Sequence, residues 1–409
     1  MTVASGRRAV ILVLDGVGVG AAPDASAYGD EGSDTLGHVC EAVGGPALPH
    51  FEAWGLGCVA ALRGVRCVES PRAAWGRMRP ASAGKDSTTG HWEIAGVQLA
   101  GPFPTYPAGF PKALVTRFAA ATGRSVIGNV VGSGTAVLDA FGPEHERTGA
   151  WILYTSADSV FQVAAHEAVV PLAELYAACE TARAMLVPPN DVSRVIARPF
   201  VGTAGAYHRT ASRRDYSVPP PSETLLDTLA SAGIARSGVG KVDDLFAGRA
   251  LAACHTSGNA EGLARVQEWI SGATSGLLFA NLVDFDTLYG HRNDPVGFAD
   301  ALRAVDTALP ALAAVLREDD LLFITADHGN DPTTASTDHA REYVPLLVAG
   351  PRVQPGGLGE RATFGDLGAT IAEWLGVAFA GTGTSFLRAV LGSPSAIASG
   401  EPAAAGASR

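Results

Sequence analysis

The chain has 409 residues, 47% of them hydrophobic and 17% charged, which is enough to build more than one domain around a large core. Its net charge of −11 argues against a nucleic-acid-binding surface, because such a surface needs a positive field. No stretch reaches the roughly 18 apolar residues of a membrane span, and five cysteines without Cys-x-x-Cys spacing favour reduced thiols, so we expect a cytoplasmic protein.

The first predicted element is a short strand over residues 9–14. It is a continuous apolar run that ends at Asp15 and a glycine-rich loop. Such a run is typical of a buried parallel strand whose carboxyl end leads into a binding site.

The segment GKDSTTGHWEIAG, residues 84–96, places three hydroxyl side chains in a row. One interpretation is local turn and helix-cap hydrogen bonding, the usual role of serine and threonine in loops. The other is a nucleophile, because Lys85 and Asp86 flank Ser87. Gly84 and Gly90 would let the backbone approach a bound anion.

The middle of the chain differs in composition, with GPFPTYPAGFP at one end and YSVPPPSET at the other. This pattern predicts an inserted α+β domain between two proline-rich hinges. We therefore predict a first core segment over residues 1–100, an inserted cap domain over 101–221 and a second core segment over 222–392. The low-complexity tail over 393–409 is expected to be disordered.

Beyond the insert, apolar strands are predicted within 276–286, 319–331 and 343–350, with helical patterns at 296–316, between the first two, and at 364–375, after the last. Strands that alternate with helices predict a doubly wound, mostly parallel α/β sheet with helices on both faces. Ligands bind such sheets beyond the carboxyl ends of the strands.

Acidic and histidine side chains lie in four segments near these strand ends. A single aspartate there is most simply a helix cap, and a single histidine a satisfied core or surface residue. Together, however, they would converge on one crevice, which predicts two divalent ions about 4 Å apart. Carboxylate with imidazole favours Mn²⁺ or Zn²⁺ over Ca²⁺. The six residues are Asp15, Asp286, His291, Asp327, His328 and His339.

A two-metal centre beside a hydroxyl triplet indicates phosphoryl transfer. With GKDSTTGHWEIAG, the segments YTSADSVFQVAAHE, RVIARPFVG, NLVDFDTLYGHRNDP and ITADHGNDPTTASTDHAREYVPLL make the chain resemble the phosphopentomutase family of the alkaline phosphatase superfamily. The resemblance runs from about residue 10 to residue 387. It implies an intramolecular phosphotransferase that interconverts ribose 1-phosphate and ribose 5-phosphate, and the 2-deoxyribose pair, through a phosphorylated hydroxyl.

The resemblance also implies how the site is divided. One Mn²⁺ would be held by Asp286, His291 and His339. The other would be held by Asp15, Asp327 and His328 together with the nucleophile's oxygen. The family's nucleophile is usually the threonine directly after Gly-Lys-Asp, and Ser87 stands at that position here. A catalytic sugar bisphosphate such as glucose 1,6-bisphosphate is the expected activator.

The inserted domain is expected to shield the intermediate from water and to hold the pentose phosphate. Ser156 and Asp158 can hydrogen-bond sugar hydroxyls. Each arginine candidate for the distal phosphate could equally be a solvated surface side chain, and Lys241, one of only three lysines, is the better candidate. The cationic candidates are Arg194, Arg198, Arg209 and Lys241.

Three alternatives remain at this point. A phosphomonoester hydrolase of the same superfamily would release free phosphate. A cofactor-independent phosphoglycerate mutase shares the core and the serine, but its cap pattern differs. A non-catalytic, metal-stabilised binding protein would carry no covalent phosphate. A sulfatase is disfavoured, because Thr88 and Thr89 follow Ser87 without the proline and arginine of that signature. The sequence leaves the oligomeric state open.

Overall fold

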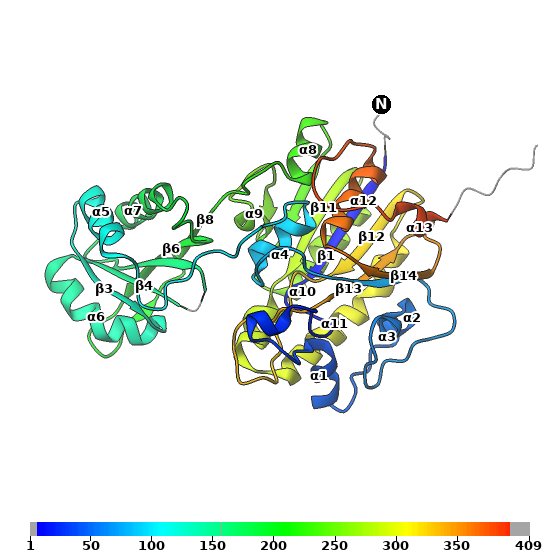
Figure 1. Ribbon diagram of the computed structural model, residues 1–409, viewed down its shortest axis with the longest axis horizontal. Helices are drawn as coiled ribbons and strands as arrows, with labels where there is room; N and C mark the ends of the chain where they lie inside the picture. The colour runs from blue at the N-terminus through cyan, green and yellow to red at the C-terminus, as the bar shows by residue number, and fades with distance from the viewer. Residues whose placement is uncertain (1–5, 157, 393–409) are drawn as a thin grey trace, which may run out of the picture.

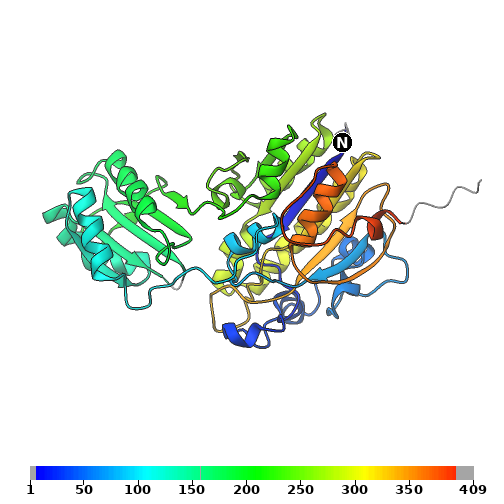
Figure 2. The ribbon, with the colours of Figure 1, turned by 45° about the horizontal axis from the view of Figure 1, so that its top comes forward.

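The structure is a computed structural model, which describes residues 6–156 and 158–392 (Figure 1). The predicted tail over 393–409 lies outside the described residues. Two sheets, each with its own helices, form a larger and a smaller lobe (Figures 1 and 2). Figure 2 shows two extended segments of the chain, one cyan and one green, joining the lobes.

The larger lobe contains an eight-stranded sheet in the order β10-β9-β11-β1-β12-β13-β2-β14. Its strands are β1 (Arg8–Leu14), β2 (Ala74–Met78), β9 (Arg236–Val239), β10 (Ala253–Cys254), β11 (Gly276–Leu282), β12 (Asp320–Thr325), β13 (Val344–Ala349) and β14 (Gly356–Arg361).

The central strand β1 is buried along its whole length and pairs in parallel with β11 and β12. Leu14 at its end is level with Leu282 of β11, so the segments that follow these strands emerge at one edge of the sheet. Strand β13 is antiparallel to both of its neighbours, β12 and β2. The predicted doubly wound, mostly parallel α/β sheet is therefore confirmed, with β13 as the strand that runs the other way.

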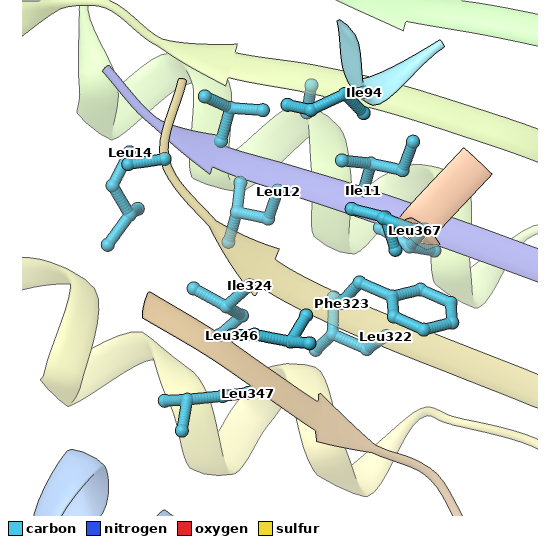
Figure 3. Close-up of a cluster of buried hydrophobic side chains, with 14 of the residues drawn as sticks. Ile11, Leu12, Leu14, Ile94, Leu322, Phe323, Ile324, Leu346, Leu347 and Leu367 are labelled. Atoms are coloured by element: carbon cyan, nitrogen blue, oxygen red, sulfur yellow. The ribbon is translucent and has the colours of Figure 1, made fainter. Parts of the chain in front are cut away.

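Helices cover both faces of this sheet (Figures 1 and 2). Helix α11 packs against α1, α2 and α10, and α12 packs against α4 and α8. In Figure 3, Ile94 of α4 and Leu367 of α12 lie against Ile11 of β1. The helices of this lobe are α1 (Thr35–Ala42), α2 (Pro49–Trp54), α3 (Leu56–Val59), α4 (Ser87–Ile94), α8 (Leu225–Ser231), α9 (Val242–Leu245), α10 (Asn259–Ser271), α11 (Pro295–Ala314), α12 (Gly365–Leu375) and α13 (Leu387–Leu391), with the shorter turns η1 (Ala25–Tyr28), η2 (Phe285–Tyr289) and η3 (Gly290–Arg292).

The smaller lobe contains a six-stranded sheet in the order β3-β4-β5-β6-β7, with β8 paired to β6. Its strands are β3 (Val126–Val131), β4 (Trp151–Thr155), β5 (Val160–His166), β6 (Arg194–Val201), β7 (His208–Arg209) and β8 (Arg214–Ser217), and its helices are α5 (Lys112–Thr122), α6 (Gly134–Thr148) and α7 (Leu172–Met185). Its buried apolar side chains form clusters separate from the core of the larger lobe. All these elements fall within the predicted cap over 101–221, although the boundaries of that domain stay a prediction.

The expectation of five reduced cysteines is wrong for one pair, because Cys58 and Cys67 form a disulfide. An isolated bridge between Leu62 and Val65 turns the chain back between them, which brings their Cα atoms to 4.4 Å. That local turn is not visible in the cysteine spacing. Among the helices that the structure describes, none is long and apolar enough to cross a membrane.

Candidate active site

A cleft of about 500 Å³ lies where the carboxyl ends of β1 and β11 face the smaller lobe. Asp15 follows β1 and Asp286 lies on η2, just beyond β11. From the smaller lobe, the loop after β4 and the strand β6 contribute to the same walls. The cleft therefore sits at the strand ends of the larger sheet, where doubly wound folds bind ligands.

The first group of metal-type ligands consists of Asp286, His291 and His339, which offer ligand atoms within 4.8 Å of one another. Nε2 of His291 lies 3.1 Å from Oδ2 of Asp286. Nε2 of His339 lies 3.6 Å from Oδ1 of the same carboxylate. Asp286 and His291 lie on the consecutive turns η2 and η3, and the tertiary structure brings His339 to them from the loop before β13.

The second group is centred on His328, in the loop after β12. Its Nε2 lies 3.3 Å from Oδ1 of Asp15 and 3.4 Å from Oδ2 of Asp327. Asp286 also lies within 4.8 Å of Asp15 and His328. Asp286 therefore borders both groups, whereas the resemblance assigned it to the first group alone.

Burial and neighbouring charges control the ionisation of these residues. Burial alone would raise the pKa of Asp286, yet the bond with His291 and the charge of His339 hold it well below its usual range. Burial would lower the pKa of His291, but Asp286 raises it to about 9. Burial and the carboxylates of Asp327 and Asp286 raise the pKa of Asp15. Carboxylates and imidazoles thus lie in a region of concentrated negative charge, and a divalent cation would offset that charge directly.

Asp327 provides a test of whether a cation fits. Its Oδ1 accepts a hydrogen bond from the backbone N–H of Gly16 at 3.1 Å, whereas its Oδ2 is buried and makes no hydrogen bond of good geometry. Nδ1 of His91 lies 3.1 Å from this oxygen but donates to the carbonyl oxygen of Ser87. Oδ2 of Asp327 also faces Nε2 of His328 at 3.4 Å. A buried carboxylate oxygen without a donor is costly unless a cation satisfies it. The donor set of three carboxylates and three imidazoles therefore fits divalent transition metals.

Ser87 lies at the first residue of α4, with Asp86 as the N-cap. Its Oγ lies 3.0 Å from Nε2 of His328 and 3.5 Å from Oδ1 of Asp15. Thr89 instead donates its hydroxyl to Asp86 at 2.6 Å, as a cap residue would. Thr88 is buried and also lines the cleft. Of the three hydroxyls, Ser87 is the one hydrogen-bonded to residues of a ligand group.

Helix α4 is held close to the second ligand group by a glycine. A Cβ added at Gly90 would lie 2.1 Å from the carbonyl oxygen of Asp327, so only glycine permits this approach. The next residue, His91, is buried, and its Nδ1 lies 2.9 Å from the carbonyl oxygen of Ser87 and 3.1 Å from Oδ2 of Asp327. The sequence analysis missed His91, although it stands in the segment that was singled out.

Lys85 also lines the cleft, but its ammonium group is held by two carboxylates. Nζ lies 2.9 Å from Oδ1 of Asp30 and 3.2 Å from Oδ2 of Asp338. Asp338 in turn accepts a hydrogen bond from the backbone N–H of His339. Lys85 thus links the segment before Ser87 to the loop that carries His339.

The candidate substrate-binding residues all line the same cleft: Ser156, Asp158, Arg194, Arg198, Arg209 and Lys241. Asp158 offers an oxygen within 4.8 Å of ligand atoms on Asp338 and His339, so the smaller lobe closely approaches the first ligand group. Burial and the nearby charge of Arg213 lower the pKa of Arg198 to about 10.

Three further residues complete the site and were missed. Nδ2 of Asn281 donates to Asp15 at 2.8 Å, and Nδ2 of Asn330 donates to Asp286 at 2.6 Å. Arg213 lines the cleft from the smaller lobe, with its guanidinium bound to Asp215. Asn330 directly follows Asp-His-Gly, so its place beside two predicted ligands was a signal that could have identified it.

Comparison with known proteins gives consistent matches along the chain. A family model described as the Metalloenzyme superfamily matches residues 7–378. Phosphopentomutase of Anaeromyxobacter dehalogenans (strain 2CP-1 / ATCC BAA-258) is 56% identical over 386 residues, which cover 94% of this chain and 99% of that protein. Phosphopentomutase of Desulfitobacterium hafniense (strain DSM 10664 / DCB-2) is 52% identical over 383 residues, covering 93% and 99%. Among solved structures, phosphoglycerate mutase of Leishmania mexicana matches with a TM-score of 0.48 and 13% identity, over 92% of this chain and 97% of that chain.

Proposed function

The chain belongs to the phosphopentomutase family, whose activity is the interconversion of α-D-ribose 1-phosphate and D-ribose 5-phosphate, and we propose that it acts through a phosphorylated Ser87 at a two-metal centre. The 2-deoxyribose phosphates are further substrates in this proposal. The observation that carries it is the position of the Ser87 hydroxyl, which contacts His328 and Asp15 and opens on the cleft shared by both lobes.

We assign the two ligand groups to two Mn²⁺ ions. Asp286, His291 and His339 would hold one ion. Asp15, Asp327 and His328 would hold the other beside Ser87. When bound, such ions stabilise the ionised hydroxyl and the charge on the transferring phosphoryl group. The buried Oδ2 of Asp327, which makes no hydrogen bond of good geometry, supports this assignment.

The position of Ser87 on its helix suits a phosphorylated side chain. The amino end of α4 carries a partial positive charge, which favours a phosphate group on its first residue. Asp86 fixes the start of the helix by accepting the N–H and the hydroxyl of Thr89. The helix end therefore pre-positions the nucleophile and costs little reorganisation when charge develops there.

The smaller lobe would orient the sugar. Ser156 and Asp158 can bind sugar hydroxyls, and the arginines of the same lobe, with Lys241 of the larger lobe, can bind the phosphate that is not being transferred. A mutase must keep a bisphosphorylated sugar while that molecule turns round, so the closed cleft also has to exclude water. A catalytic amount of glucose 1,6-bisphosphate would first phosphorylate Ser87. The four cationic residues are Arg194, Arg198, Arg209 and Lys241.

The proposal is tested by assaying conversion of ribose 1-phosphate with Mn²⁺, with and without glucose 1,6-bisphosphate, while free phosphate is measured in parallel. We expect isomerisation that far exceeds phosphate release and that depends on the bisphosphate. Phosphopeptide mapping of the enzyme treated with the bisphosphate should place the phosphate on Ser87. Release of phosphate without isomerisation would instead support the phosphomonoester hydrolase. An unmodified chain of unchanged mass would support a binding protein.

A further inference from the structure

The side chain of Arg341 is 3% exposed and lies against the segment that leads to Ser87. A guanidinium has five N–H donors, and here each one has a partner. Nε and Nη2 bind the carboxylate of Asp24 at 3.1 and 2.9 Å. The other three donors reach backbone carbonyl oxygens of one short segment: Pro80 at 3.0 Å, Ser82 at 2.6 Å and Gly84 at 2.6 Å.

The three carbonyls belong to one short segment that follows β2 and bends at Ser82 and Ala83, so they can converge on one guanidinium. Only Lys85 and Asp86 separate Gly84 from Ser87. A buried charge is expensive unless it is paired and fully hydrogen-bonded, and Asp24 supplies that pairing. Three of the five guanidinium donors of Arg341 therefore hold the segment that leads to Ser87, and the other two bind Asp24.

The backbone of Arg341 extends the same connection. Its N–H donates to Oδ2 of Asp30 at 2.9 Å, and Asp30 also binds Nζ of Lys85. Arg341 stands two residues after His339, in the same loop. A single residue thus joins the loop of one metal-type ligand, the segment over 24–30 and the segment of the candidate nucleophile.

We propose that Arg341 is a positioning residue for phosphoryl transfer, fixing the Ser87 hydroxyl against the ligand groups. This inference rests on the function proposed above. Arg341 is not among the described residues that line the cleft, so it acts through the backbone and not on the substrate. Lysine cannot replace it, because three tetrahedral donors cannot span a carboxylate and three carbonyls at once. A misplacement of about 1 Å at a reacting atom can lower a rate about 100-fold.

The test compares Arg341→Lys with Arg8→Lys. Arg8 is a matched control, since its guanidinium is also buried and also binds one aspartate and two backbone carbonyls, those of Ile270 and Gly272. It lies at the start of β1, at the opposite end of that strand from Asp15. We expect Arg341→Lys to lower kcat about 100-fold, with KM for ribose 1-phosphate and Mn²⁺ stoichiometry unchanged. The rate of enzyme phosphorylation by glucose 1,6-bisphosphate should fall in parallel. Arg8→Lys should lose stability but keep kcat.

Equal loss of kcat in the two variants, a kcat within threefold of wild type, or loss of a metal ion in Arg341→Lys would each overturn the inference. If Arg341→Lys does not fold, Asp24→Asn decides, because the Asp24 carboxylate is 49% exposed and asparagine keeps the size of the side chain. Asp24→Asn should lower kcat several-fold at constant KM, and an unchanged kcat would refute the positioning role. A wild-type enzyme without mutase activity would refute the proposed function itself.

Discussion

The two sides of the cleft are built in opposite ways. On the larger lobe, the candidate ligand carboxylates are almost fully buried, with Asp15 at 4% and Asp286 at 5% exposure, and neighbouring amides and imidazoles fix them. On the smaller lobe, Arg194 and Arg198 are half-buried and Arg209 is exposed. A rigid side suits bond making, which needs atoms placed within fractions of an ångström. An adaptable cationic side suits an intermediate that presents one phosphate and then the other.

The strongest test of this contrast is removal of the nucleophile. We expect Ser87→Ala to abolish both enzyme phosphorylation and turnover, a loss of about 10⁴-fold or more, as is usual when a nucleophile is deleted. Ser87→Thr should stay active, because it keeps the hydroxyl. The added methyl group restricts χ1, which changes the free energy of positioning the hydroxyl by about 1 kcal/mol or less. Phosphopeptide mapping and a turnover assay measure both. Phosphate on Thr88 or Thr89 in an active Ser87→Ala variant would contradict the assignment.

Metal removal is the next largest effect on the rigid side. Asp286 borders both ligand groups, so Asp286→Ala should weaken both metal sites, whereas His339→Ala should weaken one. We expect nearly complete loss of activity in both variants with the fold retained, because neither side chain belongs to the apolar core. Metal analysis after dialysis gives the stoichiometry and circular dichroism the fold. Chelation should inactivate the wild type, and Mn²⁺ should restore it. Unchanged stoichiometry in both variants would show that the ligands were misassigned.

Substitutions of residues that would orient the sugar phosphate should have a smaller and different effect, whether on the smaller lobe, as for Asp158, or at the N-cap of α9 on the larger lobe, as for Lys241. We expect Asp158→Ala and Lys241→Ala to impair isomerisation about 10- to 100-fold, the cost of losing one or two charge-assisted hydrogen bonds. Phosphorylation of the enzyme by glucose 1,6-bisphosphate should fall much less, since that step depends on the metal side. Parallel assays of isomerisation and of enzyme phosphorylation measure how the two losses compare in each variant. An equal loss in both steps for Asp158→Ala would remove the functional distinction between the lobes.

The sequence predicted the parts of the site that local pattern determines. Asp15 and Asp327 each follow a continuous apolar run, and such runs become buried parallel strands whose ends meet at one edge. It could not predict that β13 runs antiparallel, because strand direction depends on the path of the loop that carries His339. Likewise, the disulfide between Cys58 and Cys67 follows from a local turn.

Contacts between distant segments were the other feature that the sequence could not predict. The five side-chain hydrogen bonds of Arg341 join three segments that are far apart in the chain, and no periodicity marks such a residue. The position of Asp286 between both ligand groups depends on the short turn η2, where an extended strand end was expected. These features arise only after the sheet has assembled, so neither residue spacing nor composition predicts them.

The smallest predicted effect concerns the stability of the smaller lobe in acid. His145 is fully buried there, its Nδ1 donating to the carbonyl of Ala150 at 2.6 Å and its Nε2 accepting the backbone N–H of His166 at 2.9 Å. One ring nitrogen thus donates and the other accepts, which is the hydrogen-bonding pattern of the neutral imidazole. Burial lowers the pKa of His145 below its usual 6.5, with further lowering by His166 and Arg124 against the opposing effects of the Ala150 bond and Glu146.

A depressed histidine pKa makes the unfolded chain bind the proton more readily than the folded one. The stabilisation is thus complete above pH 6.5 and is lost as the pH falls below that value, at about 1.4 kcal/mol per unit of pKa difference. Hydrogen exchange of peptides from α6 and β5, corrected for the intrinsic rate, should show faster local opening at pH 5.5 than at pH 7.5. We expect His145→Gln to reduce this pH dependence. His208→Gln, which alters an exposed histidine of the same lobe, should leave it unchanged. If the two variants respond alike, another group governs the acid sensitivity of this lobe.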